Sequence, residues 1–151
     1  MKRFHFTLEA LLDLRRRKED ECKQELAKVN TRLLDAQGGL RAIEQEWVEL
    51  QNSELERRKR GVTPESMGQA VAYRLHLEHK AILQELEIRR IAAEQEQKRH
   101  MLVKATQERK ALENLRERRY EEWRKIANRA EAKTIDDLCQ IQYVRNLRAA
   151  G

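Results

Sequence analysis

Apolar residues recur along the first third of the chain at alternating steps of four and three residues. This series, which we call the seam, is apolar at every position: Cys22, Leu26, Val29, Leu33, Ala36, Leu40, Ile43, Trp47 and Leu50. An average step of 3.5 residues keeps one stripe of an under-wound helix facing a partner helix. The pattern therefore predicts a long helix that packs against another helix.

The seam extends towards the N-terminus with charges among its members. Its four further positions are Leu8, Leu12, Arg15 and Glu19. Two glycines, Gly38 and Gly39, lie inside the same helix, and each costs about 1 kcal/mol relative to alanine. They indicate either a tolerated soft spot on the outer face, or a hinge or close approach by a partner.

A corner follows, around the only proline of the chain, Pro64. Gly61 is suited to the left-handed residue that ends a helix, and Thr63 to the N-cap of the next one. Pro64 favours the first helical position, and Val62 and Met67 have the spacing of a hydrophobic staple. We expect an all-α fold, a long two-helix antiparallel coiled-coil hairpin with a C-terminal helical overhang. The expected single domain covers 1–151, with helix one at about 5–60, the corner at about 61–63 and helix two at about 64–148.

A corner near residue 62 places position i opposite about residue 124 minus i. Trp47 then faces Leu77, and Ile43 faces Ala81. The second helix offers apolar residues in two phases, which differ by two residues: first Leu75, Ile82, Leu86 and Ala93, then Leu102, Ala105 and Leu112. We expect the phase to slip in the polar run at 94–98.

The same register leaves residues 120–150 without a partner in the hairpin. Their larger apolar residues are Tyr120, Trp123, Ile126, Ile135, Leu138, Ile141, Val144 and Leu147. Apolar side chains of this number need cover from a neighbouring copy, a folded-back third helix or another protein. Thr134–Asp137 resembles a capping box, which predicts a fresh short helix.

The sequence contains no pattern that carries catalysis. There is no phosphate-binding glycine loop, and the serines have no base arranged beside them. His76 and His79 have zinc-ligand spacing, but no third ligand follows nearby. Cys22 and Cys139 are 117 positions apart, so we expect two reduced thiols and no disulfide. We expect no enzyme activity, no cofactor, no metal site and no catalytic residue.

Charged residues make up 38% of the chain, and the net charge is +6. Both signs are mixed throughout, whereas nucleic-acid arms concentrate one sign, so we expect no nucleic-acid partner. Three basic clusters, Arg15–Lys18, Arg57–Arg60 and Arg116–Arg119, are binding surfaces or ordinary solvated surface. No signal peptide and no transmembrane segment is apparent, which suggests a cytoplasmic location.

Two terminal segments resemble the FliJ family of flagellar export proteins. "FHFTLEALLDLRRRKEDECKQELA" (Phe4–Ala27) has the family's paired aromatics and basic-acidic run. "ERKALENLRERRYEEWRK" (Glu108–Lys125) is similar to its leucine, basic and aromatic segment. The resemblance implies a non-enzymatic component of type III flagellar export, similar to the central stalk of rotary ATPases. It further implies three partners: the hexameric export ATPase FliI, the cytoplasmic domain of the export gate FlhA, and export chaperones. The chain would be peripheral at the cytoplasmic face of the inner membrane.

The resemblance also implies two sets of binding residues. The residues that match the ring-binding end are Phe4, Phe6, Leu8, Leu11, Leu115, Arg118, Arg119, Tyr120 and Trp123. Those assigned to the export gate are Leu40, Ile43, Trp47, Leu50, Tyr73, His76 and Leu77. Ile43 and Leu50 are also seam positions, and Phe4 and Trp123 are either partner anchors or packed on each other.

Three other functions stay open at this point. One is the corresponding stalk of a virulence-type secretion system, which belongs to the same structural class. Another is a basic coiled coil that binds nucleic acid, with strongly salt-dependent affinity. The last is a self-assembling coiled coil whose apolar overhang drives dimerisation.

Overall fold

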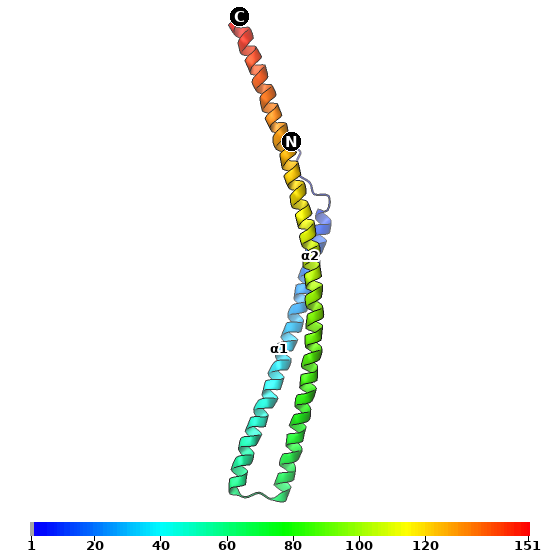
Figure 1. Ribbon diagram of the computed structural model, residues 1–151, viewed down its shortest axis with the longest axis vertical. Coiled ribbons are helices and arrows are strands. Elements are labelled where there is room, and N and C mark those ends of the chain that lie inside the picture. The colour runs from blue at the N-terminus through cyan, green and yellow to red at the C-terminus, as the bar shows by residue number, and fades with distance from the viewer. Residues whose placement is uncertain (1) are drawn as a thin grey trace. The chain divides into compact units, whose positions relative to one another are not determined.

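The computed structural model describes residues 2–151. It consists of two helices, α1 (Glu9–Arg60) and α2 (Pro64–Ala150), and residues 2–151 contain no strand (Figure 1). The all-α prediction is confirmed. The contacts divide the chain into two compact units, described separately below. Unit 1 comprises the residues up to Glu19 together with Ala105–Gly151, and unit 2 comprises Asp20–Lys104. The expectation of a single domain stays a prediction.

Unit 2 is an antiparallel helical hairpin. All nine seam positions between Cys22 and Leu50 are buried or half-buried, which confirms the predicted stripe. Val29, Ala36 and Ile91 form its buried core cluster, with Leu33 and Ile88 packed against them. The packing of apolar side chains from both helices is the main force that holds such a hairpin together.

The corner of unit 2 has the predicted local structure. Gly61 adopts a φ of 101°, in the left-handed region that favours glycine. The Ser66 backbone N–H donates a hydrogen bond of 3.3 Å to Thr63 Oγ1, so Thr63 caps α2. Pro64 is the first residue of α2, where its missing N–H costs nothing.

Of the two phases predicted for the second helix, the first is wrong. The second is confirmed, since Ala105 is buried and Leu102 and Leu112 are half-buried. All four residues of the first predicted phase are exposed: Leu75, Ile82, Leu86 and Ala93. One unbroken series of steps of four and three faces α1 instead, and in unit 2 it contains Ala70, Arg74, Leu77, Ala81, Gln84, Ile88, Ile91, Gln95, Lys98 and Leu102. Polar side chains occupy several positions of this series. The pattern of apolar residues alone therefore favoured a neighbouring stripe of the helix.

Polar residues of this series bond across the hairpin, so the phase does not slip at 94–98. Gln95 donates a hydrogen bond of 2.6 Å to the Asn30 side chain, one position from the predicted opposite residue. Lys98 lies 4.0 Å from the Glu25 carboxylate. The polar groups of these side chains find partners on α1 within the seam. The two helices therefore stay in register there.

Gly39 accommodates a close approach from α2. Gln84 Nε2 donates a hydrogen bond of 2.7 Å to the backbone carbonyl of Ala36. A Cβ atom added at Gly39 would lie 2.8 Å from that nitrogen, whereas one added at Gly38 would meet nothing within 4 Å. The approaching group thus belongs to this chain, and Gly38 is the outer soft spot that the sequence suggested.

In unit 1, residues 2–8 are not helical. Helix α1 starts at Glu9 and not near residue 5 as predicted. Phe6 is buried, and the Phe4 ring lies 5.3 Å from that of Tyr120 and 5.8 Å from that of Trp123. Residues 2–8 lie outside α1, and from there Phe4 contacts α2 at Tyr120 and Trp123.

The overhang of α2 is shorter than predicted. Tyr120 and Trp123 contact Phe4, Ala127 is buried, and residues 128–151 are all exposed. The predicted fresh helix at Thr134 is also wrong, since α2 continues through this position to Ala150. Thr134 Oγ1 donates a hydrogen bond of 2.9 Å back to the Ala130 carbonyl, so its hydroxyl does not cap a new helix.

Candidate partner-binding sites

Three aromatic side chains form a cluster in unit 1. Phe4 meets Tyr120 edge to face, with an interplanar angle of 79°, and Tyr120 and Trp123 are stacked with centroids 5.8 Å apart. Such pairs contribute about 0.5–1.5 kcal/mol each beyond the area they bury. Phe4 and Trp123 therefore pack on each other, one of the two alternatives the sequence left open. Tyr120 keeps 39% of its surface exposed.

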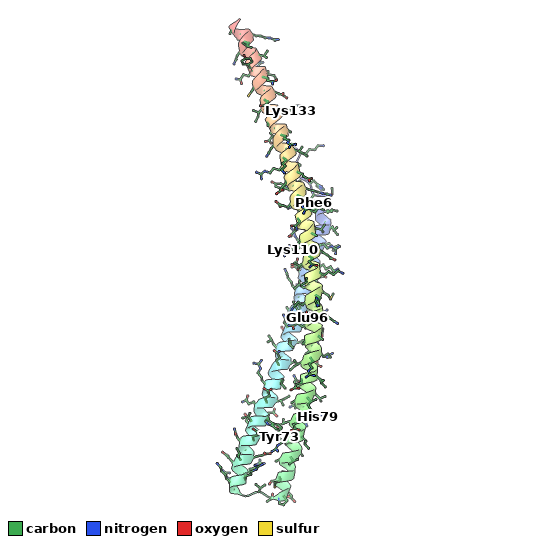
Figure 2. The ribbon with its side chains drawn as sticks, viewed as in Figure 1. Phe6, Tyr73, His79, Glu96, Lys110 and Lys133 are labelled. Carbon is green, nitrogen blue, oxygen red and sulfur yellow. The ribbon has the colours of Figure 1, made fainter. Side chains whose placement is uncertain are left out.

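The other predicted ring-binding residues differ in how accessible they are. Phe6, labelled in Figure 2, is only 4% exposed. The Arg119 guanidinium lies 5.9 Å from the Phe6 ring centroid. Arg119 also donates a hydrogen bond of 3.1 Å to Thr7 Oγ1. Leu8 and Leu115 are half-buried, whereas Leu11 and Arg118 are exposed. Unit 1 brings these residues together, but Phe6, Leu8 and Leu115 are mainly part of its packing.

A buried ion pair holds the helices of unit 1 at two seam positions. Glu19 is 4% exposed and accepts a hydrogen bond from Arg109 Nε, while Arg109 Nη1 bonds to Glu113 at 2.5 Å. The bond to Glu19 raises the pKa of Arg109 above its ordinary value. The sequence marked Glu19 only as an interruption. The signal for the pair was an arginine at the facing position of the second helix.

Two of the three basic clusters form ion pairs within unit 1. Arg15 lies 2.5 Å from Glu108, and Arg16 lies 3.5 Å from Glu113. In the cluster at Arg116–Arg119, Arg116 pairs with Glu9 at 3.0 Å. These arginines therefore bond between the helices, in addition to the i,i+4 pairing that was expected on one helix.

A groove of about 360 Å³ lies between the helices of unit 2. Four of the predicted gate-binding residues line it: Leu40, Ile43, Trp47 and Leu77. Ile43 and Leu77 are 6% and 1% exposed, so both are core residues. Trp47 is half-buried, and Val48, a lining residue absent from the prediction, is 53% exposed. Val48 is thus the most exposed apolar side chain of this groove, and Trp47 and Leu40 are partly accessible.

The remaining predicted gate residues lie outside the groove lining. Leu50 is half-buried in the seam. Tyr73 is 44% exposed, and its hydroxyl donates a hydrogen bond of 3.1 Å to the Glu46 carboxylate. This bond, with the carboxylate charge, raises the pKa of Tyr73. The His76 ring lies 6.4 Å from that of Tyr73, so these two rings form a separate exposed pair.

Residues 2–151 contain neither a candidate metal cluster nor a candidate membrane-spanning helix. No group of three histidine, cysteine, aspartate or glutamate side chains there could hold a metal ion. Cys22 and Cys139 are free cysteines. No helix in the described part of the chain combines the length and the apolar character needed to cross a bilayer.

The sequence was also compared with known protein families. The family model described as "Flagellar FliJ protein" matches residues 4–148. The chain belongs to the FliJ family. The resemblance noted at the two terminal segments is confirmed, and the match also includes the corner and most of the overhang. Searches of curated proteins and of solved structures each found no match. FliJ membership connects the chain with the flagellar export apparatus, and the family is a non-enzymatic export component.

Proposed function

We propose that this chain acts as a central-stalk-like component of flagellar export, with one end in the export ATPase ring and another region on the export gate. It further escorts export chaperones at the cytoplasmic face of the inner membrane, where its partners hold it. FliJ membership supports a flagellar role over the corresponding stalk of a virulence system. The fact that Arg15, Arg16 and Arg116 are ion-paired disfavours the nucleic-acid alternative.

The proposal rests mainly on the exposed end of α2. Between residue 128 and Ala150 every side chain is exposed, and six are large and apolar: Ile135, Leu138, Ile141, Tyr143, Val144 and Leu147. Burying apolar surface gains roughly 25 cal/mol per Å², so a helix of this kind gains most inside a partner. The ring of the export ATPase is the occupant that FliJ membership suggests, and Lys133 marks this segment in Figure 2.

The gate contact is proposed for the groove of unit 2. Trp47 and Val48 offer accessible apolar surface there, between the exposed carboxylates of Glu44 and Glu78. An apolar centre with a polar rim is typical of protein interfaces. Tyr73 and His76 would extend the same contact as a second aromatic anchor.

The ring contact is tested by the ATP hydrolysis rate of the cognate export ATPase with and without this chain. Ile141→Glu should abolish stimulation, since it puts a charge on the exposed end of α2. Leu75→Glu, at an equally exposed position of unit 2, is the matched control and should stimulate normally. Trp123→Ala should reduce stimulation in part, because it loosens the cluster with Phe4. If neither the unaltered chain nor any variant stimulates hydrolysis while circular dichroism shows intact helix, the stalk proposal is wrong.

The gate contact has its own test. Val48→Glu should weaken binding to the purified cytoplasmic domain of the export gate about tenfold or more, as expected for a central apolar contact. Leu34→Glu changes an exposed apolar residue of α1 that does not line the groove, and should bind like the unaltered chain. Equal weakening by both substitutions would place the contact elsewhere.

A further inference from the structure

We propose that the corner of unit 2 is a binding site for an acidic peptide segment of a partner protein, which inserts an aliphatic side chain between the two helices. This site is separate from the groove at Trp47 and from the end of α2. The inference does not depend on the proposed function, and each can fail without the other.

The seam has no large apolar side chain to fill its last layers at the corner. After Leu50, the next α1 positions of the seam are Glu54 and Arg57, and α2 contributes Ala70 and Arg74. Figure 1 shows the two helices of unit 2 diverging toward the corner. The space between them is a groove of about 290 Å³, near the lower end of the range for ligand pockets.

The lining of this groove combines an apolar floor with positive charge. Val62, Met67, Ala70 and Val71 supply the apolar part, and Met67 and Val71 are 57% and 51% exposed. Methionine adapts its shape to different apolar groups, which suits it to a binding surface. The floor therefore accepts an aliphatic side chain, and its own exposed apolar surface would be covered on binding.

Three arginines line the same groove: Arg57, Arg58 and Arg74. Arg57–Arg60 makes no ion pair with any of residues 2–151, unlike the clusters of unit 1. Arg74 pairs with Glu54, the one carboxylate among the lining residues. Guanidinium groups bind carboxylates through two parallel hydrogen bonds, so the excess charge favours an acidic ligand.

An unsatisfied oxygen of Glu54, a residue that lines the groove, favours a ligand that carries a hydrogen-bond donor. Glu54 Oε2 accepts from Arg74, but Glu54 Oε1 is buried and has no hydrogen-bond partner among residues 2–151. A buried acceptor left unsatisfied costs roughly 1–3 kcal/mol, so a donor that reaches it gains affinity. A peptide backbone N–H supplies such a donor. The acyl chain of a lipid, the part that would occupy the apolar floor, carries no such donor.

The test follows the methyl signal of Met67 by NMR in the full chain labelled with ¹³C-methyl methionine. The probe is acetyl-Glu-Glu-Leu-Leu-Glu-Glu-amide, added to millimolar concentration. The Met67 signal should shift with saturation, while that of Met101, equally exposed in unit 2 but outside the groove, should not. The matched peptides with lysine in place of glutamate, or alanine in place of leucine, should leave Met67 unmoved.

Two variants with the same change of charge sharpen the test. Arg57→Glu with Arg58→Glu should weaken binding about tenfold, and Lys80→Glu with Arg89→Glu, exposed on α2, should not. These side chains are exposed, so circular dichroism should show the same helix content in both variants. The proposal is overturned if Met67 does not respond, if the lysine peptide acts equally, or if both double variants weaken binding alike. A Met67 response to phosphatidylglycerol vesicles and not to the peptide would overturn it in favour of a membrane contact.

Discussion

Units 1 and 2 hold the same two helices together by different means. In unit 2 an apolar cluster of Val29, Ala36 and Ile91 forms the core of the seam, and polar side chains such as Gln95 bond across it. In unit 1 a glutamate and an arginine, Glu19 and Arg109, take facing positions in the seam. The buried apolar residues of unit 1 are Phe6, Leu12, Ala105 and Ala127.

The two kinds of packing contribute differently to the stability of the helix pair and to the choice of its register. Apolar burial stabilises a helix pair but tolerates sliding by a heptad, because one apolar layer resembles the next. A buried ion pair contributes little net stability, yet any other register would separate Glu19 from Arg109 and remove their mutual compensation. We therefore expect unit 2 to supply stability, and the Glu19–Arg109 pair to specify the register in unit 1.

The largest predicted effect comes from a matched pair of leucines. Among residues 2–151, Leu77 in unit 2 and Leu12 in unit 1 are the largest fully buried side chains. Either Leu→Ala substitution should cost roughly 2–5 kcal/mol, through lost burial and the cavity that remains. Each unit contains one tryptophan, Trp47 or Trp123, so urea unfolding can be followed by fluorescence in single-tryptophan variants.

The two tryptophans also test whether the units unfold together. If they unfold separately, Leu77→Ala should shift the Trp47 transition and Leu12→Ala the Trp123 transition. If both probes shift equally in each variant, the chain unfolds as the single domain that its sequence predicts.

A second prediction concerns the ion pair of unit 1. Glu19→Ala should cost about 1–3 kcal/mol in urea unfolding, since Arg109 loses its buried partner but keeps Glu113. Replacing both Glu19 and Arg109 with leucine should restore or raise stability, because an apolar pair avoids the cost of desolvating charge. Crosslinks between introduced cysteines on α1 and α2 should then report more than one register. A single register in the double variant would show that the pair does not specify it.

The third prediction compares two adjacent glycines of unit 2. Gly38→Ala should stabilise the chain by roughly 0.5–1 kcal/mol, because alanine favours helix and the added Cβ meets nothing. Gly39→Ala should gain little or nothing, since its Cβ displaces Gln84 from the Ala36 carbonyl. Thermal unfolding measured by circular dichroism distinguishes the two, and equal gains would contradict the close approach at Gly39.

The smallest predicted effect is on the ionisation of Tyr73 in unit 2. The bond to Glu46 raises the pKa of Tyr73 in the folded chain, so its stabilisation is present below about pH 10 and is lost as pH rises through the folded value. Glu46→Gln should return the pKa towards its ordinary value, and Glu49→Gln should lower it less. A ¹³C-tyrosine NMR titration measures both, and a larger effect of Glu49→Gln would contradict the assignment of the bond.

The candidate sites were predicted unevenly. Local sequence identified the Thr63 cap, the left-handed Gly61 and the terminal aromatics, because each depends on residues close in the chain. It could not separate the accessible Trp47 and Val48 from the buried Ile43 and Leu77, since both kinds are apolar and lie within one helical turn of the seam. The groove at the corner was also missed, because it arises from side chains that are too small or too charged to fill a space between helices.

The sequence by itself determined that this protein is a pair of long helices joined at residues 61–63, because the seam of α1, the proline and the cap each act locally. It also contained the FliJ signature in its terminal segments. Only the tertiary structure decided which stripe of α2 faces α1, since Gln84, Gln95, Lys98 and Arg109 are acceptable in a seam only when a partner satisfies them. It likewise decided that residues 2–8 are not helical. The contacts of Phe4 with Tyr120 and Trp123 stabilise that conformation, and residues more than a hundred positions apart cannot show such contacts in a local pattern.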